Sequence, residues 1–189
     1  MWKFRQKSKI AIFILAFFVL SSLAGVAAAQ VILPAAVMPN DPKLDGQYYL
    51  AQIRALPAWS TIKEAPEIVV AVIDSGVDIE HPDLSANIWK NTGEIPNDKI
   101  DNDSNGYVDD VNGWDFIANS ADPRPKIAKN YSVLGINHGT LVAGVIGAVG
   151  NNNFGISGLA WKIKLMPLRV MDALGAGNTK DLYQAIKYA

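Results

Sequence analysis

The sequence predicts an α/β domain with a mainly parallel sheet. The continuous run of β-branched and apolar residues at 68–73 is typical of a strand buried on both faces of such a sheet, and 163–170 is predicted to be another buried strand. A segment with helical periodicity follows each run, and strands that alternate with helices are the pattern of the α/β class. The 189 residues are 50% apolar and 19% charged, which is the balance of a globular chain.

Residues 1–29 have the features of a secretory signal peptide. Four basic residues among the first nine precede an apolar stretch at 10–26, and three alanines at 27–29 provide a cleavage site. An uncleaved membrane anchor is the alternative, but the apolar stretch is barely long enough to span a bilayer. We therefore expect the leader to be removed and the remaining chain to be secreted, extracellular and free of stable membrane association.

Charge and cysteine content narrow the possible functions of the exported chain. Without the leader, Lys+Arg falls from 17 to 13 against 18 acidic residues, which gives a net charge of −5. This charge removes the electrostatic basis for binding nucleic acid. Because the chain has no cysteine, bound metal ions are the expected source of cross-linking, and calcium is the natural candidate outside the cell.

An N-terminal arm at 30–66 precedes the expected domain at 67–189. Five prolines and the turn signal Asn40-Asp41-Pro42 indicate a packed arm with one or two short helical turns, too short to be a domain. Within the domain, Asn178 is expected to cap the last helix, with Asp181 at its third position and apolar residues along one face.

Asp74 directly follows the first predicted strand, at the end of the sheet where open α/β proteins place their chemistry. Taken alone, Asp74 fits a turn-capping carboxylate equally well. His138 is expected in the first turn of a helix, in which small residues within 138–144 let the helix pack closely. The residues at helical spacing with His138 are Leu141, Val142, Val145, Ile146 and Val149. His138 alone would be a structural histidine, and His81, which precedes a proline in a turn, is expected to be structural.

Together, Asp74-Ser75-Gly76-Val77, the following His81-Pro82-Asp83-Leu84 and the segment His138–Gly144 resemble the motifs of the subtilisin-like serine proteases. This is the subtilase or peptidase S8 family, and the resemblance is to its thermitase-type members. It extends from about Asn40 to Ala189 and implies the N-terminal part of a three-layer α/β/α fold, incomplete at the C-terminus. One departure is Leu141, where the family usually has a second histidine.

The resemblance implies an Asp-His-Ser triad acting on polypeptide substrates in a monomeric serine-type endopeptidase. Asp74 would orient the imidazole, and His138 would be the general base and then the general acid. The segment Gly175-Ala176-Gly177 would be an edge strand that pairs with substrate backbone, with a plain glycine-rich loop as the alternative. Neither the family's serine motif nor its oxyanion asparagine has a match here, so this chain alone is expected to be inactive.

Two other functions are alternatives to the protease. A non-catalytic, secreted calcium-binding protein or decayed gene product is the alternative that remains open. A phosphatase or nucleotide-binding protein is disfavoured, because no second aspartate follows Asp74 by two residues and no phosphate-binding glycine motif occurs.

An acidic loop at 97–110 predicts a calcium site. Oxygen ligands alternate from Asp101 through Asp103 and Asn105, and Gly106 is the sixth residue of this loop, which suits a hard cation with many ligands. The resemblance adds Asp98 and the carbonyl of Tyr107. A solvated acidic loop is the alternative. An EF-hand is disfavoured, because no clear helices flank the loop and position twelve is Asn112 instead of glutamate.

The resemblance also implies a second, tighter calcium site that would clip the arm to the domain. Ordinary turn chemistry is the alternative for its side chains. Its implied ligands are the side chains of Asp41, Asp83 and Asn152 and the carbonyls of Val149, Phe154 and Ile156.

Overall fold

A computed structural model describes residues 37–189. The expected signal peptide and the first part of the arm lie outside the described residues. Within the described part, no helix is long and apolar enough to cross a membrane. The elements in chain order are η1 (Leu44–Gly46), α2 (Tyr48–Gln52), α3 (Ala55–Trp59), β1 (Glu64–Asp74), η2 (Ser85–Asn87), β2 (Trp114–Asp115), α4 (Val133–Gly147), β3 (Lys162–Arg169) and α5 (Thr179–Tyr188).

The three strands form one parallel sheet in the order β1-β3-β2. This confirms the predicted sheet type and both predicted strands, while the two-residue strand β2 was not predicted. In the register of the sheet, Asp74 and Asp115 both pair with Arg169. Three ionisable residues therefore end neighbouring strands at the carboxyl edge of the sheet.

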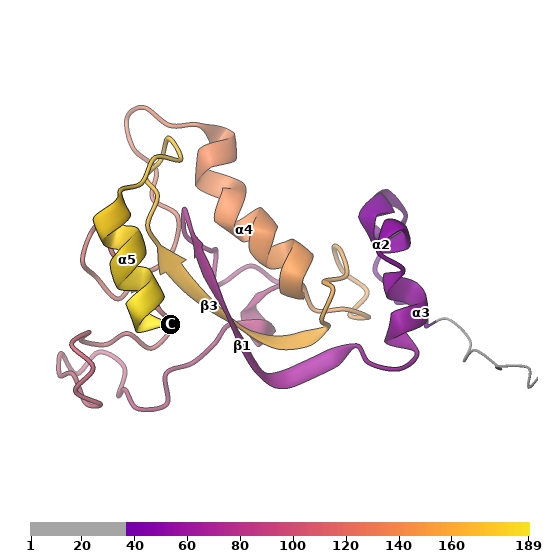
Figure 1. Cartoon of the computed structure of the whole chain (residues 1–189), viewed down its shortest axis with the longest axis horizontal. Helices are drawn as coiled ribbons and strands as arrows, with labels where there is room; N and C mark the ends of the chain where they lie inside the picture. Colours follow the sequence, from indigo (N-terminus) through magenta and orange to yellow (C-terminus); the bar gives the residue numbers. More distant parts are fainter. Residues whose placement is uncertain (1–36) are drawn as a thin grey trace, which may run out of the picture. The chain divides into compact units, whose positions relative to one another are not determined.

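Helices α4 and α5 pack on opposite faces of the sheet, as Figure 1 shows. Because successive strand residues point to opposite faces, Val72 and Leu165 pack towards α4, whereas Met166 and Leu168 pack towards α5. This arrangement is the predicted three-layer α/β/α architecture.

Only the carboxyl half of β1 is buried. Ile68 and Val69 are 49% and 41% exposed and belong to no buried cluster, whereas Val72 is 3% exposed. The prediction that this run is buried on both faces is wrong for its first half, because neither helix covers that part of the strand in the described chain.

Helix α4 begins at Val133, five residues before His138, because Ser132 caps it by accepting the backbone N–H of Gly135 at 3.1 Å. The prediction of His138 in the first turn is therefore wrong, and its imidazole projects from the second turn instead.

Small residues form the buried face of α4. Gly139, Ala143 and Gly147 recur every four residues and are buried, whereas Leu141 and Val145 are 57% and 44% exposed. A Cβ on Gly139 would lie 2.3 Å from the carbonyl oxygen of Gly76, so the helix and the turn after β1 are packed backbone to backbone. Of the large apolar residues that indicated the helix in the sequence, Val142 and Ile146 pack partly buried against the core, whereas Leu141 and Val145 are exposed.

Asn178 caps α5 as predicted, with its Oδ1 accepting the backbone N–H of Asp181 at 2.9 Å. Of the expected apolar face of this helix, Ala185 is fully buried, while Leu182 and Ile186 are 43% and 60% exposed.

The arm docks on the far end of the domain. A separate apolar cluster joins the arm to the domain, in which Leu50, Ala55 and Trp59 are buried against Trp161. The short helices agree with the predicted helical turns, but β1 begins at Glu64, so the expected boundary at 66 falls inside the strand.

Candidate active site

Asp74 is held rigidly at the carboxyl end of β1. Its residue is 6% exposed, and its Oδ1 accepts the backbone N–H of Ser75 at 2.6 Å. Its carbonyl oxygen accepts the backbone N–H groups of Val170 and Met171, which follow β3, at 2.8 and 3.2 Å. Both the backbone and the carboxylate of Asp74 are therefore fixed by neighbouring main chain.

His138 faces this carboxylate from α4. Its Nδ1 lies 2.9 Å from Oδ1 and 2.8 Å from Oδ2 of Asp74, and its side chain is 52% exposed. An ionised carboxylate can only accept hydrogen bonds, so this contact selects the imidazole tautomer with hydrogen on Nδ1. In that tautomer Nε2 is a free base, and no hydrogen bond to Nε2 is found within the described chain.

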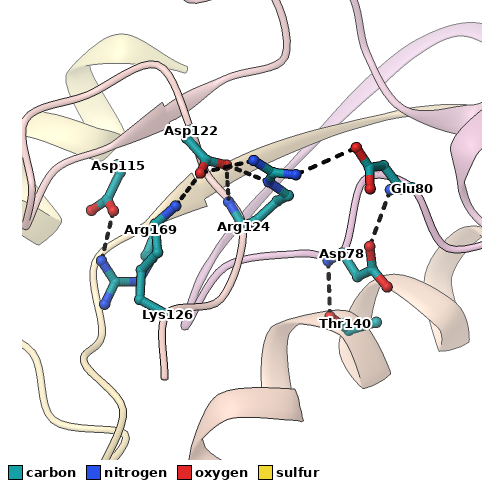
Figure 2. Close-up of polar contacts among 8 residues, drawn as sticks. All are labelled: Asp78, Glu80, Asp115, Asp122, Arg124, Lys126, Thr140 and Arg169. Carbon is teal, nitrogen blue, oxygen red and sulfur yellow. Dashed lines mark hydrogen bonds and ion pairs between the residues drawn. The ribbon is translucent and has the colours of Figure 1, made fainter. Parts of the chain in front are cut away.

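Hydrogen bonds join α4 to the turn after Asp74. The hydroxyl of Ser75 donates to the carbonyl of Ile136 at 3.2 Å and accepts the N–H of Gly139 at 3.1 Å. The hydroxyl of Thr140 accepts the N–H of Asp78 at 3.0 Å, as Figure 2 shows. Sequence reasoning did not assign these positioning contacts, although Ser75 and Thr140 lie within the two motifs that it identified.

The segment from Asp122 to Lys126, called here the charged rim, packs against the turn after Asp74. The carbonyl of Pro123 accepts the N–H of Val77 at 3.2 Å. Figure 2 shows the carboxylate of Asp122 between Arg124 and Lys126, and Arg124 reaches Glu80 at 3.3 Å. The rim and the start of α4 line an open cleft of ≈ 750 Å³.

The charged rim shifts the acidity of Asp122. Partial burial raises the pKa of this carboxyl, but side-chain hydrogen bonds from Arg124 and Lys126 outweigh it and lower the pKa to about 2. No sequence motif indicated this rim, because its partners are assembled from a loop without secondary structure.

Arg169 and Asp115 form a buried ion pair beside Asp74 in the sheet. The distance from Nη1 of Arg169 to Oδ2 of Asp115 is 2.6 Å, and their side chains are 6% and 0% exposed. Oδ1 of Asp115 also accepts the N–H groups of Ile117 and Ala118 at 3.0 Å each. The pair therefore anchors the loop after β2 to the end of β3.

His81 has a structural contact, as the sequence predicted. Its Nδ1 lies 3.1 Å from the backbone nitrogen of Asp83 and accepts that N–H. This contact selects the opposite tautomer from that of His138, with the hydrogen on Nε2.

The segment Gly175–Gly177 forms a turn rather than the expected edge strand. Gly177 pairs with Met171 in an isolated antiparallel bridge, and the carboxylate of Asp172 accepts the N–H groups of Leu174 and Ala176 at 2.9 Å each. Backbone donors, first Ala176 and then Leu174, hold the pKa of Asp172 below its usual value. The turn lies beside the first turn of α4, where a Cβ on Gly135 would be 3.0 Å from the nitrogen of Gly175.

The acidic loop gathers three carboxylates that could hold a metal ion. Oxygens of Glu94, Asp101 and Asp103 lie within 4.8 Å of one another, which suits a hard cation. Glu94 was missed by sequence reasoning, because it lies outside the alternating ligand pattern. Asp98 is not part of this group, and its Oδ1 accepts the N–H of Ile100 at 2.8 Å.

The remaining expected ligands of the acidic loop take part in hydrogen bonds that stabilise its turns. The side-chain oxygen of Asn105 accepts the N–H of Tyr107 at 2.8 Å, and the Asn105 amide donates to Asp110 at 3.0 Å. The hydroxyl of Tyr188 also donates to Asp110, and burial followed by this contact raises the pKa of the tyrosine.

Asp41 and Asp83 both contact the loop that follows α4. They are 4% and 2% exposed, and no lysine, arginine or histidine of the described chain forms an ion pair with either. Asn152 joins them, because its N–H donates to Asp41 at 3.0 Å and its amide donates to Asp83 at 2.9 Å. Two buried carboxylates without a cationic partner fit a bound cation.

The backbone of the loop after α4 closes around the same two carboxylates. The N–H of Ile156 donates to Asp83 at 2.9 Å, and the N–H of Val149 donates to the Asp83 carbonyl at 2.8 Å. Phe154 lies between Val149 and Ile156 in the chain and donates its N–H to the Asn152 side-chain oxygen at 2.8 Å. The structure thus brings the residues of the second predicted calcium site into one region.

This arrangement of buried aspartate, helical histidine and parallel sheet belongs to a known family. The subtilase family model matches residues 65–189, and the chain is therefore a member of the subtilase family. Subtilases are serine-type endopeptidases, as the names of the related proteins also indicate.

Individual relatives agree with this assignment. Subtilisin-like protease 1 of Plasmodium vivax is 44% identical over 120 residues, which cover 63% of this chain and 18% of that protein. Thermitase of Thermoactinomyces vulgaris is 33% identical over 152 residues, covering 80% of this chain and 43% of thermitase. A solved protease structure from Pseudoalteromonas arctica has 30% identity and a TM-score of 0.57, covering 79% of this chain and 43% of that one. The chain thus spans less than half the length of these relatives.

Proposed function

We propose that this chain supplies the aspartate and histidine of the triad of a secreted serine-type endopeptidase. The observation that carries the proposal is the contact of His138 Nδ1 with both carboxylate oxygens of Asp74, at 2.9 and 2.8 Å. The leader pattern at 1–29 supports export.

The geometry suits the division of labour in such a triad. Asp74 holds the imidazole in the tautomer whose Nε2 can take a proton from a serine hydroxyl, and its negative charge stabilises the imidazolium that forms. His138 then returns the proton to the leaving amine. The nucleophile must come from a segment of Gly-Thr-Ser type, which does not occur in these 189 residues, so we expect no peptide hydrolysis by this chain alone.

Polypeptides are the proposed substrates of the protease, and we place their backbone along Gly175–Gly177. These three residues are exposed, and Gly175 lies beside the first turn of the helix that carries His138. Because the segment is a closed turn here, substrate pairing would have to use its outer edge. We expect the chain to act as a monomer.

Calcium is the proposed cofactor at two places. The buried pair Asp41 and Asp83, with Asn152 and the backbone around it, would bind one ion and fasten the arm to the domain. The cluster of Asp101 and Asp103 with Glu94, to which we add the predicted ligands Asp98, Asn105 and Tyr107, would bind another. Bound calcium would supply positive charge that offsets repulsion between these carboxylates.

A non-catalytic calcium-binding protein is the second candidate, and the burial of Asp41 and Asp83 without a cationic side chain beside them in the described chain favours it. The two candidates differ in the state of His138. A catalytic dyad requires one defined tautomer, whereas calcium binding places no requirement on this residue.

Nitrogen NMR of the two histidines tests the proposal. Long-range ¹H–¹⁵N spectra should report hydrogen on Nδ1 for His138 and on Nε2 for His81, which serves as the internal control. Asp74→Asn should change the tautomer of His138 alone, because an amide can donate a hydrogen bond to Nδ1. The matched change Asp78→Asn should leave the tautomers of both histidines unchanged. A mixture of His138 tautomers whose proportions are the same in the unchanged chain and in Asp74→Asn would rule out the proposed dyad.

A further inference from the structure

Residues 127–131, called here the open segment, connect the charged rim to α4 without being held by the rest of the chain. All five residues are exposed, Ile127 by 78% and Tyr131 by 52%. Within the described chain, no hydrogen bond involves any backbone or side-chain group of these five residues. Their backbone N–H and C=O groups are therefore available to another molecule.

Firm anchors bound the open segment on both sides. Before it, the carbonyl of Pro123 accepts the N–H of Val77, and Lys126 pairs with Asp122. After it, the N–H of Ser132 donates to the carbonyl of Ala173 at 2.9 Å, and the Ser132 hydroxyl caps α4. Extension of the open segment therefore breaks no hydrogen bond of the fold.

Three other exposed loops are held by hydrogen bonds that the open segment lacks. In the acidic loop, the N–H groups of Asn102, Asn105 and Gly106 all donate to carboxylates. In the turn at 172–177, three N–H groups are bonded to Asp172. In the loop after α4, Asp41 accepts two N–H groups.

Proteases bind substrate as an extended strand, so a loop must release its own hydrogen bonds before it can be cut. We propose that the open segment is the primary processing site of this chain, cut by a subtilase that carries the nucleophilic serine segment which these 189 residues lack. In the cut, water adds across one peptide bond, so one fragment gains a carboxylate and the other an amine. The identity of the cutting enzyme rests on the proposed function, whereas the location of the cut does not.

The two fragments should remain associated after the cut. The first would contain β1 with Asp74, and the second would contain α4 with His138 as well as β3 and α5. Parallel pairing of β1 with β3 and the apolar core beneath α4 join the two fragments. The product is therefore a two-chain form in which the Asp74–His138 contact crosses from one fragment to the other.

Limited proteolysis of the 189-residue chain with purified thermitase, in buffer containing calcium, tests the site. Intact-mass measurements at early times should find the first cut inside 127–131, with both fragments in one size-exclusion peak. Because thermitase is added, this result does not depend on any activity of the chain itself. A first cut in 98–106, 150–156 or 172–177 would overturn the proposal, as would fragments that separate.

Paired variants supply the control. Ala128→Pro combined with Asn130→Pro removes backbone N–H groups and fixes φ within the open segment, so the first cut there should be lost. Ala128→Ser combined with Asn130→Ser keeps the backbone free and should be cut like the unchanged chain. Equal cutting of both pairs would show that backbone availability does not determine the site.

Discussion

Replacement of Gly139 by alanine tests the close packing between α4 and the turn after Asp74. The new Cβ would lie 2.3 Å from the carbonyl oxygen of Gly76, where 3.0 Å is the practical minimum, so the helix must retreat by about 0.7 Å. The hydrogen bond from Gly139 N–H to the Ser75 hydroxyl, 3.1 Å long, would then stretch beyond hydrogen-bonding range. Overpacking costs about 1–3 kcal/mol and the lost hydrogen bond about 1 kcal/mol, against a gain of roughly 0.5–1 kcal/mol from helix propensity.

The matched control is Gly144→Ala in the same helix, whose new Cβ would meet only the Cδ1 of Ile156, at 3.4 Å. This variant should gain roughly 0.5–1 kcal/mol from helix propensity alone. Urea unfolding followed by tryptophan fluorescence should therefore give a lower midpoint for Gly139→Ala and an unchanged or higher midpoint for Gly144→Ala. Equal midpoints for the two variants would refute the inferred backbone contact between α4 and the turn.

Three further results are expected. Asp115→Leu should lower the free energy of unfolding by about 3–5 kcal/mol, because it leaves Arg169 buried without its carboxylate partner. Glu64→Leu removes the exposed ion pair with Lys162 and should lower the same quantity by under about 1 kcal/mol. Equal losses in the two variants would contradict the burial of the Asp115–Arg169 pair. The pKa of Asp122 is lowered from 3.8 to about 2, so its stabilising effect is complete above pH 3.8 and disappears as the pH falls to about 2; an acid titration should find this small contribution absent in Asp122→Asn. Calcium at a hundred times its Kd should add about 2.7 kcal/mol to the free energy of unfolding, and Asp83→Asn should reduce this gain, whereas an unchanged gain would place the ion elsewhere.

The sequence was most informative where side-chain pattern and backbone geometry coincide. The β-branched run at 68–73 identified β1, the largely apolar run at 163–170 identified β3, and Asn178 identified the start of α5, because each depends on local propensities. The family motifs identified Asp74 and His138 as a pair, and the structure brings them into contact. The role of this pair remains a proposal.

What the sequence did not reveal depends on contacts between distant segments. Small residues were expected to let α4 pack closely, but the sequence did not show that Gly139 is the one that faces the backbone of the turn after Asp74. Glu94 joins the acidic cluster through the path of a loop, which periodicity cannot report. The exposure of Ile68 depends on where the helices end, and an apolar run by itself contains no such information.

The docked arm has a consequence for the order of folding. The amide of Gln47 both donates to and accepts from the backbone of Ser157, at 2.8 Å each, across 110 residues of sequence. Closing so long a loop carries a large entropic cost until β1, α4 and β3 have already drawn its ends together. The arm, which precedes the rest of the domain in the chain, should therefore be among the last parts to acquire native contacts, and its attachment should report the completion of folding.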